Sequence, residues 1–584
     1  MTDKELKKLK DDLWHSADML RAGAHLSANK YGQPILGLIF LRYADIRYKQ
    51  HKAEIEAKYN ERKGTRKEKS LKEISIEVCG FYLPPEAYFD AINDAPDDAN
   101  KAILVKNAMQ AIEDNNDKMA GVLPKEVYGQ LVPEEEPELL SKIVRVFKDI
   151  PEDISIDLFG EIYEFFLGSF ALAEGKDGGT FYTPASVVRY MVEVLQPTSG
   201  GDKKILDPAC GSGGMFVQAA RFMHQHNTNA VDTLKFRCYG VEKEPDTVKL
   251  AKMNLLLNNV RGEITEANSF YSDPYDAVGQ FDYVMANPPF NVDEVVYDKV
   301  KADARFNTYG IPRNKTKASG KKESDKKETV PNANYLWISY FASALNESGK
   351  AALVMANSAS DAGKSEYEIR KKMIQEGIIS QMVTLPSNMF ASVTLPATLW
   401  FFDKAKAATN RKDEILFIDA RNVFTQVDRA HRKFSDEQIK NLGIISRLYE
   451  GDTQAYADLL VEYREAMAAA PESSDDKEEK TKAFYQAQID WLTERFPDGV
   501  YCDVVGLCKV AKLDGEDGII DQDYSLNAGR YVGVVIEDDG MTAEEFKAEM
   551  LALYEELSHL NHEAQEHVVQ IARNLNSIFE TPSC

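Results

Sequence analysis

Hydrophobic residues change their spacing along the chain, and the changes divide it into three stretches. Near the N-terminus, apolar residues such as Leu6, Leu9 and Leu13 recur every three or four positions, the spacing of a helix with one buried face. Between about 200 and 405, short apolar runs alternate with helical patterns, which is typical of a mostly parallel sheet with crossover helices. From about 425 the helical spacing returns. The pattern therefore predicts an α/β centre flanked by helical regions.

The N-terminal region, 1–165, is expected to be all helical. Its run Ile35–Tyr43 is almost entirely apolar, so this helix should be buried on most sides or covered by a partner. Further helices are expected over Ala91–Asp114, Pro137–Lys148 and Asp157–Leu172.

The central region, 166–425, is predicted to hold the sheet. Its expected strands are short and apolar: 204–206, 236–241, 263–268, 281–286, 351–356, 379–385 and 397–402. Its expected helices are Met215–His224, Pro245–Asn259, Asn334–Leu345 and Glu366–Gln375. The polar stretch 291–333 interrupts this alternation and is predicted to be a mobile insertion.

The C-terminal part is predicted to consist of a mixed region, 426–540, and a long helix, 541–584. From Phe546 to Ile578 the apolar residues of that helix step by three and four, which gives a nearly heptad seam with one extra turn. Such a seam either folds back on its own domain or binds a partner helix.

Composition narrows the class of protein. A chain of 584 residues with 44% hydrophobic and 28% charged residues is ordinary globular material, long enough for several domains. The absence of a long apolar run and the charged N-terminus predict a cytoplasmic protein without a membrane span or secretory signal. The six cysteines show no CxxC pair and no histidine at metal spacing, so no metal site is predicted.

The formal net charge of −24 bears on nucleic-acid binding. A protein that binds DNA normally presents a basic surface to the phosphates. This chain alone should bind DNA poorly, so a positive surface is either local or supplied by another subunit.

The first candidate segment is Asp207-Pro-Ala-Cys-Gly-Ser-Gly-Gly214, which lies between a predicted strand and a predicted helix. Gly211, Ser212, Gly213 and Gly214 form a turn that lets a ligand approach the backbone, and the amides that open the helix can face an anionic group. Asp207 would repel a phosphate and suit an ammonium group. No Gly-Lys-Ser/Thr follows, which disfavours a P-loop.

Glu242 ends the second predicted strand. An acid about 20 to 30 residues past the turn is placed to accept hydrogen bonds from ribose hydroxyls. Phe216 stands where the dinucleotide fingerprint requires its third glycine. The pocket is therefore expected to hold a nucleoside with an amino acid end, and S-adenosylmethionine fits it better than NAD.

The second candidate segment, Asn287-Pro-Pro-Phe290, follows the predicted strand 281–286. Asn287 and Pro288 offer a rigid row of carbonyl acceptors, and Phe290 offers an aromatic face. Together these residues can hold a planar exocyclic amine with its lone pair turned toward an electrophile. The alternative is an Asn-Pro turn with an incidental aromatic residue.

With the third segment, Gly178-Gly-Thr-Phe-Tyr-Thr-Pro184, these motifs resemble the amino-methylating DNA methyltransferases. More closely, residues 1 to about 425 resemble the modification subunit of type I restriction-modification systems. The resemblance implies a Rossmann-like S-adenosylmethionine-dependent methyltransferase sheet with an N-terminal all-helical domain and a helical C-terminal tail. It also implies a site-specific N6-adenine DNA methyltransferase that flips its target base.

The resemblance also assigns residues. Thr180, Phe181, Tyr182, Thr183 and Pro184 would cap the methionine end of the cofactor, although Thr183 and Pro184 are also good helix-capping residues.

Asn268 stands where the family usually places an aspartate that binds the cofactor's adenine, with Asp273 as the alternative. Phe390 lies in a segment that resembles the wall of the base pocket, but it is equally compatible with a core position. The basic stretch 313–327 is either a solvated loop or a contact to the DNA backbone.

The implied partners are double-stranded DNA, a specificity subunit bound through the C-terminal helix, and a second copy of the chain. Cleavage would belong to a third subunit with nuclease and translocase activity. Two alternatives remain: methylation of another planar nitrogen, such as cytosine N4, guanine N2 in RNA or glutamine in protein, and a non-catalytic assembly scaffold.

Overall fold

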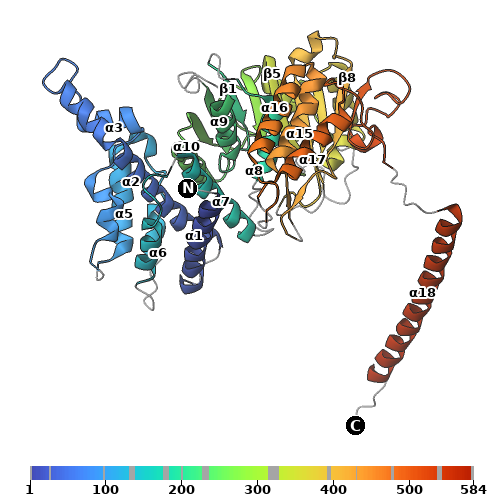
Figure 1. Cartoon of the computed structure of the whole chain (residues 1–584), viewed down its shortest axis with the longest axis horizontal. Helices are drawn as coiled ribbons and strands as arrows, with labels where there is room; N and C mark the ends of the chain where they lie inside the picture. Colours follow the sequence, from blue (N-terminus) through green and yellow to red (C-terminus); the bar gives the residue numbers. More distant parts are fainter. Residues whose placement is uncertain are drawn as a thin grey trace. The chain divides into compact units, whose positions relative to one another are not determined.

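The computed structural model divides into two compact units, 1–533 and 534–584, each considered by itself below (Figure 1). It describes residues 3–24, 28–96, 99–130, 138–154, 156–174, 183–198, 202–226, 236–313, 328–390, 396–428, 431–474, 479–535 and 542–579.

The N-terminal part of the first unit is helical, as predicted. Its helices are α1 (Asp3–Ala24), α2 (Ala28–Arg62), α3 (Leu71–Cys79), α4 (Phe89–Asn93), α5 (Lys101–Asn115), α6 (Leu139–Lys148) and α7 (Ile156–Glu174). They enclose one hydrophobic core, in which the run Ile35–Tyr43 is buried as expected. Met253 and Leu257 of a later helix join the same core, so this region packs against the sheet region.

The helical segments predicted over 91–114 form two helices, α4 and α5, with a break between them. Helix α4 ends at Asn93, and Pro96 follows, which lacks an amide hydrogen and disfavours helical geometry at the residue before it. The buried ammonium group of Lys101 donates to carbonyl oxygens of the broken segment, including that of Ile92 at 2.6 Å. The break is therefore stabilised by its own hydrogen bonds.

Three acids of the helical region converge and are matched by three bases. The acids are Asp45, Asp90 and Glu152, and the bases are Arg42, Lys49 and Lys148. Asp45 lies 3.1 Å from Arg42 and 3.0 Å from Lys49. The carboxylates lie close enough together to hold a cation, but the chain's own bases already supply the positive charge.

The central sheet has nine strands among the described residues, in the order β11-β8-β6-β7-β5-β4-β1-β2-β3. Their bounds are β1 (Lys204–Asp207), β2 (Arg237–Glu242), β3 (Gly262–Glu266), β4 (Phe281–Ala286), β5 (Leu345–Ala356), β6 (Ile379–Thr384), β7 (Ala397–Asp403), β8 (Glu414–Asp419) and β11 (Cys508–Lys512). β7 is antiparallel to β5 and β6, β11 is antiparallel to β8, and the other pairs are parallel. The sequence-predicted strands and α/β class are confirmed.

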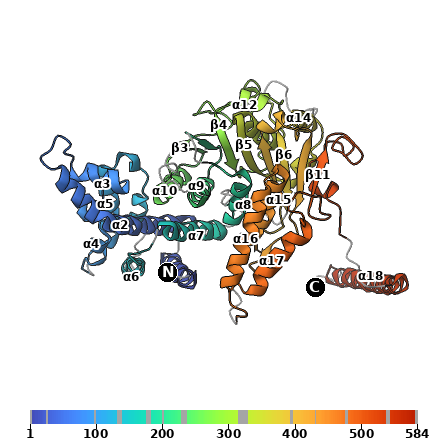
Figure 2. The same ribbon diagram turned by 45° about the horizontal axis from the view of Figure 1, so that its top comes forward.

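Both faces of the sheet are buried because helices cover each one. On β1 and β4, Ile205 and Met285 belong to one core, whereas Leu206 and Val284 belong to the other. Helices on the first face are α8 (Ala185–Leu195), α9 (Gly214–His226), α10 (Pro245–Leu257), α15 (Asp436–Glu450), α16 (Thr453–Ala469) and α17 (Lys482–Arg495). Those on the second face are α12 (Ala304–Asn307), α13 (Asn334–Ala344) and α14 (Ser365–Gln375), and Figure 2 labels α12 and α14 beside the sheet.

The predicted division at residues 165, 425 and 540 stays a prediction. Helix α7 runs across position 165, and β11, from the predicted region 426–540, extends the central sheet. The described part of the predicted insertion contains the short helices α11 (Tyr297–Val300) and α12. Residues 314–327, which hold all of the basic stretch except Arg313, lie outside the described residues. A small hairpin, β9 (Thr425–Gln426) and β10 (Arg432–Lys433), follows β8.

The second unit contains the predicted C-terminal helix, α18 (Ala543–Phe579). Thr542 and Glu545 cap its start reciprocally, since the Glu545 amide donates to the Thr542 hydroxyl and the Thr542 amide donates to the Glu545 carboxylate. Large apolar side chains along it are about half exposed: Phe546, Met550, Leu553, Leu557, Leu560, Val568, Ile571 and Leu575. No helix within the described ranges is both long and apolar enough to cross a membrane.

Candidate active site

The two central motifs meet at the topological switch point of the sheet. From β1 the chain builds β2 and β3 outward on one side, and then returns to place β4 against the other side of β1. Ligands of open α/β sheets bind at the carboxyl ends of the strands at such a point. Asp207 ends β1 and Asn287 directly follows β4, with Leu206 paired to Val284 just before them.

The glycine turn after β1 is shaped as a cradle. Gly211 and Gly213 have φ angles of 51° and 79°, which favour glycine. A Cβ at Gly213 would come within 2.9 Å of Leu255 Cδ1, whereas a Cβ at Gly211 or Gly214 would meet no atom within 4 Å. Gly211 and Gly214 therefore face the open space of a pocket.

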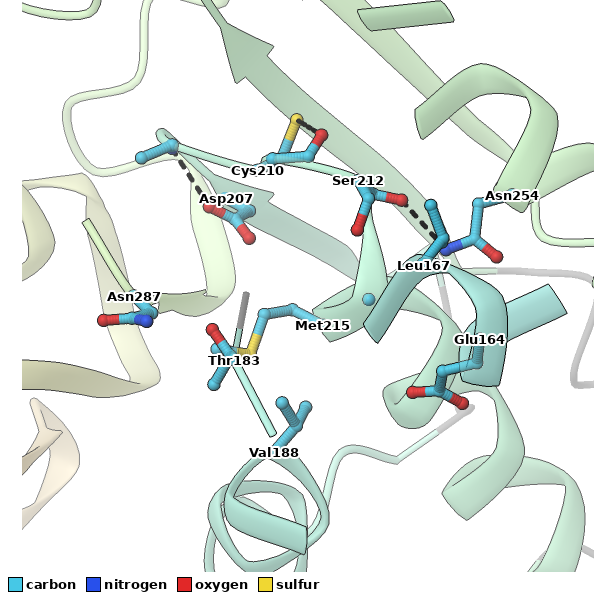
Figure 3. Close-up of a pocket in the computed structure, with 13 residues that line it drawn as sticks. Glu164, Leu167, Thr183, Val188, Asp207, Cys210, Ser212, Met215, Asn254 and Asn287 are labelled. Carbon is cyan, nitrogen blue, oxygen red and sulfur yellow. Dashed lines mark hydrogen bonds between the residues drawn. The ribbon is translucent and has the colours of Figure 1, made fainter. Parts of the chain in front are cut away.

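That pocket draws its residues from the helical region, the glycine turn and the end of β4 (Figure 3). Its lining comprises Glu164, Leu167, Thr183, Val188, Asp207, Ala209, Cys210, Gly211, Ser212, Gly214, Met215, Asn254 and Asn287. Two of these described residues are acids and none is a lysine, arginine or histidine. The charge of the lining favours a ligand that carries positive charge.

Asp207 is almost fully enclosed, with 1% of its surface exposed. It accepts one hydrogen bond, 3.0 Å from the amide nitrogen of Ala209. Burial raises the pKa of Asp207 well above its usual value, and the nearby Glu242 raises it further. A cationic ligand would offset both effects.

Asn287 is the other buried polar group of the pocket. It is 8% exposed, and neither Oδ1 nor Nδ2 has a hydrogen-bond partner in the described part of the chain. Leaving a buried polar group unsatisfied costs about 1–3 kcal/mol. Such a group in a pocket indicates a missing ligand, and an amide can offer one acceptor and two donors to it.

The turn after Asn287 is held in place by a reciprocal pair of asparagines. Asn291, at a φ of 54°, donates its amide to Asn334 Oδ1 at 2.8 Å, and Asn334 Nδ2 donates to Asn291 Oδ1 at 2.9 Å. Phe290, which directly precedes Asn291, is half-buried and packs against the cores on both faces of the sheet. Pro288 is buried.

Thr183 lines the pocket, in agreement with its predicted neighbourhood. The capping alternative fails, because Pro184 is the residue before α8 and no side chain there caps the helix. Thr180, Phe181 and Tyr182 lie outside the described residues.

Glu242 ends β2, as expected, but it is not among the residues that line the pocket. Its carboxylate accepts hydrogen bonds from the amide of Gly211 at 3.1 Å and from the amides of Lys243 and Glu244. Glu242 therefore supports the glycine turn directly, and its ribose contact stays a prediction.

The two residues predicted to bind the cofactor's adenine make hydrogen bonds within the chain. Asn268 Oδ1 accepts from the amide of Phe270 at 3.0 Å. Asp273 accepts from the amide of Ala277 and lies 3.6 Å from the buried Arg305. Neither residue lines the pocket, so the adenine contact also stays a prediction.

Phe390, proposed from sequence as a base-pocket residue or a core residue, is 5% exposed and belongs to a core cluster. The segment around it is fastened to the β9–β10 hairpin, where Arg432 donates to Ser387 at 3.0 Å and its amide donates to the Asn388 carbonyl oxygen. These contacts favour the core position for Phe390.

Sequence reasoning missed two polar side chains of the pocket, Glu164 and Asn254, together with several apolar lining residues. Asn254, in α10, is 2% exposed and donates to the carbonyl oxygen of Ser212 at 2.9 Å, so its side chain helps to hold the glycine turn in place. Each looks in sequence like an ordinary polar position in a helix. The only signal was that both interrupt the buried face of an amphipathic pattern.

The pocket fits the predicted cofactor. Its glycine cradle leaves open space beside the backbone, its acids suit a cationic amino acid end, and Asn287 offers unpaired polar atoms in the same pocket. S-adenosylmethionine carries an ammonium, a carboxylate and a sulfonium group, which match these features.

Comparisons with known proteins agree with this chemistry. The family model described as N-6 DNA Methylase matches residues 154–460, and the HsdM N-terminal domain matches residues 9–147. The chain is 32% identical over 579 residues to the type I restriction enzyme MjaIX methylase subunit of Methanocaldococcus jannaschii, covering 96% of this chain and 90% of that protein. It is also 32% identical over 503 residues to the HindI methylase subunit of Haemophilus influenzae, covering 83% and 93%.

Solved structures share the fold. The crystal structure of the type I restriction-modification methyltransferase subunit from Streptococcus thermophilus matches with a TM-score of 0.65 at 20% identity, over 90% of this chain and 99% of that one.

Proposed function

From the premise that this chain belongs to the N-6 DNA methylase family, as a methylase subunit of a type I restriction-modification system, we propose that the pocket between β1 and β4 is its adenine-methylating site. The cofactor is S-adenosylmethionine and the product is N6-methyladenine in DNA. The observation that carries the proposed site is the buried, unpaired amide of Asn287 beside Asp207 and the glycine turn.

Asn287 and Pro288 act on the target amine by holding it. Asn287 Oδ1 and the Pro288 carbonyl oxygen accept hydrogen bonds from the N6 amino group, which fixes its plane and turns its lone pair toward the cofactor. Phe290 stacks on the purine ring. When bound, S-adenosylmethionine supplies a methyl group on a positively charged sulfur, so catalysis by the chain is largely positioning and electrostatics.

Asp207 and the glycine turn hold the cofactor's amino acid end. The turn formed by Gly211, Ser212, Gly213 and Gly214 leads into the start of α9, where a carboxylate is favoured. Thr180 to Pro184 close over that end, Glu242 binds the ribose, and Asn268 binds the adenine. These assignments rest on the motif positions together with the pocket formed by Thr183, Asp207 and the turn.

The target base must leave the duplex to reach this pocket, which costs a few kcal/mol that stacking and hydrogen bonding offset. With a net charge of −24, the chain depends on partners for much of its DNA contact. It acts in the cytoplasm on double-stranded DNA.

Its partners are a specificity subunit, a second copy of the chain and, for cleavage, a restriction subunit. The half-exposed apolar seam of α18 supports helix-to-helix binding to the specificity subunit. A structure solved to explain the complex assembly of a type I restriction-modification system matches this chain with a TM-score of 0.51 at 17% identity.

The test is purification of the chain with the specificity subunit from its own locus, followed by methylation of DNA with labelled cofactor and digestion to nucleosides. Label in N6-methyladenine is expected. Label in N4-methylcytosine, RNA or protein would move the activity to another planar nitrogen. Failure of the assembled complex to bind S-adenosylhomocysteine would leave a non-catalytic scaffold.

A further inference from the structure

Glu164 lines the pocket from the helical region. In the sequence it precedes all three motifs. It lies on α7, its side chain is 16% exposed, and it is among the residues that line the pocket, where Figure 3 draws it. Its position is therefore that of a ligand-facing acid.

Two residues of α9 hold the Glu164 carboxylate in a fixed orientation. Gln218 Nε2 lies 2.8 Å and 2.9 Å from its two oxygens, and Arg221 Nη1 lies 3.1 Å from Oε2. Gln218 and Arg221 follow Gly214, the residue that opens α9 and faces the pocket. A carboxylate has about four acceptor positions, so it can take a further hydrogen bond while these contacts persist.

The charge of the pocket indicates what that further donor is. Glu164 and Asp207 are the two charged residues among those described around the pocket. The cofactor brings two positive centres, the ammonium and the sulfonium, and one carboxylate that the amides of the glycine turn can bind. Within the lining, two acids face the two cations, while Arg221, which pairs with Glu164 from α9, is not among the lining residues.

We propose that Glu164 is a further cofactor-binding residue, whose carboxylate accepts a hydrogen bond from the ammonium group of the S-adenosylmethionine tail. The inference rests on the proposed cofactor site and adds a contact from the helical region to it. It also gives that region a role in cofactor affinity. The competing role is purely structural: Glu164 would only fasten α9 to α7.

The cofactor-binding role and the structural role can be distinguished by changing both the ligand and the residue. Calorimetry on the full chain measures binding of S-adenosylhomocysteine and of its analogue without the α-amino group, to the unmodified protein and to Glu164→Gln. We expect Glu164→Gln to weaken S-adenosylhomocysteine about 10- to 100-fold, because a charge-assisted hydrogen bond is lost. The deaminated analogue should lose no more than about 2-fold, since the group that Glu164 contacts is already missing.

Glu161→Gln is the matched control. Glu161 lies one turn earlier on α7, pairs with Lys10 at 3.3 Å and has a side chain that is 43% exposed, so its removal should leave both affinities within about 2-fold. If Glu164→Gln fails to fold, Glu164→Asp retains the charge and shortens the side chain, and a loss confined to S-adenosylhomocysteine is again expected.

An equal loss with both ligands, or no loss with either, would overturn the proposal and leave Glu164 as a structural residue. In those cases S-adenosylhomocysteine still binds the unmodified protein, so the proposed function stands. Absence of binding to the unmodified protein, alone and with its specificity subunit, would overturn the function and the proposal together.

Discussion

The acid cluster of the helical region and Asp207 at the sheet edge each include a buried carboxylate, but they differ in what neutralises them. In the helical region, a hydrogen bond from Lys49 lowers the pKa of Glu152, with further help from Arg42 and Lys148. At the sheet edge, burial raises the pKa of Asp207 instead. The first group is satisfied within the chain, and the second is not.

This difference separates structural polar clusters from functional ones. Buried carboxylates alone would mark both places as candidate sites, and the three acids around Asp45 even have the spacing of a cation site. The supply of positive charge and hydrogen-bond partners decides between them. Variants of each place should therefore affect different quantities, stability in one and ligand binding or catalysis in the other.

The largest effect is expected at Asn287. Asn287→Ala removes a preorganised acceptor for the target amine, so methyl transfer by the assembled complex should fall at least about 1,000-fold. Binding of S-adenosylhomocysteine should stay within about 3-fold, measured by calorimetry. Asn410→Ala, an exposed position between β7 and β8 at the opposite edge of the sheet, should retain full activity. Undiminished transfer by Asn287→Ala would remove this residue from the site.

In the helical region the expected loss is of stability. Asp45→Ala removes the nearest carboxylate of the buried Arg42, at 3.1 Å, and leaves it Glu152 at 3.8 Å and two backbone carbonyl oxygens, which should lower the free energy of unfolding by about 3 kcal/mol. Urea unfolding of the full chain measures the loss. The folded fraction should bind S-adenosylhomocysteine as tightly as the unmodified protein does. If Asp45→Ala changed the affinity for S-adenosylhomocysteine and left the stability unchanged, the cluster around Asp45 would be functional rather than structural.

Asp207 should couple cofactor binding to pH. Its pKa in the folded protein is raised above the ordinary value of 3.8, so its contribution to stability is present below that value and is lost as the pH rises through the folded pKa. A cationic ligand favours the ionised form, so binding should release a proton and tighten as the pH rises. Calorimetry in buffers of different ionisation enthalpy measures the proton.

Asp207→Asn should abolish that proton release and weaken S-adenosylhomocysteine about 10-fold, while the ligand-free protein loses its pH-dependent destabilisation. Proton release that persists in Asp207→Asn would show that another group titrates in this range.

A smaller effect is expected at the asparagine pair behind the catalytic turn. Asn291→Ala removes the acceptor for Asn334 and leaves alanine, which tolerates positive φ less well than asparagine, at a φ of 54°, so kcat should fall about 5- to 10-fold with an unchanged KM for the cofactor. Asn291→Gly tolerates that backbone angle and keeps the amide donor, so it should recover part of kcat. Equal kcat values for the two variants would exclude backbone strain as the cause.

The sequence predicted the sheet and its motifs because glycine and proline mark strand ends. Strand β4 occupies Phe281–Ala286 as predicted, with Asn287 directly after it. The apolar runs of the parallel strands and the segment Asp207–Gly214 are local signals of the same kind. Such features depend on neighbouring residues, so a pattern can show them.

What the sequence did not predict depends on residues far apart in the chain. Glu164 becomes a pocket residue only because Gln218 and Arg221 approach it from α9. Glu242 turns its carboxylate to the Gly211 amide, a contact across 31 positions. The break after α4 is stabilised by Lys101, which the helical pattern itself includes.

The most direct test of the active-site assignment is a structure of the assembled complex with the cofactor analogue sinefungin and a duplex that contains its mapped recognition sequence. The target adenine should lie outside the helical stack, with N6 within hydrogen-bond distance of Asn287 Oδ1 and the Pro288 carbonyl oxygen, and the analogue beside Asp207. An adenine bound elsewhere, or an Asn287 side chain that remains unpaired with both ligands present, would contradict the assignment.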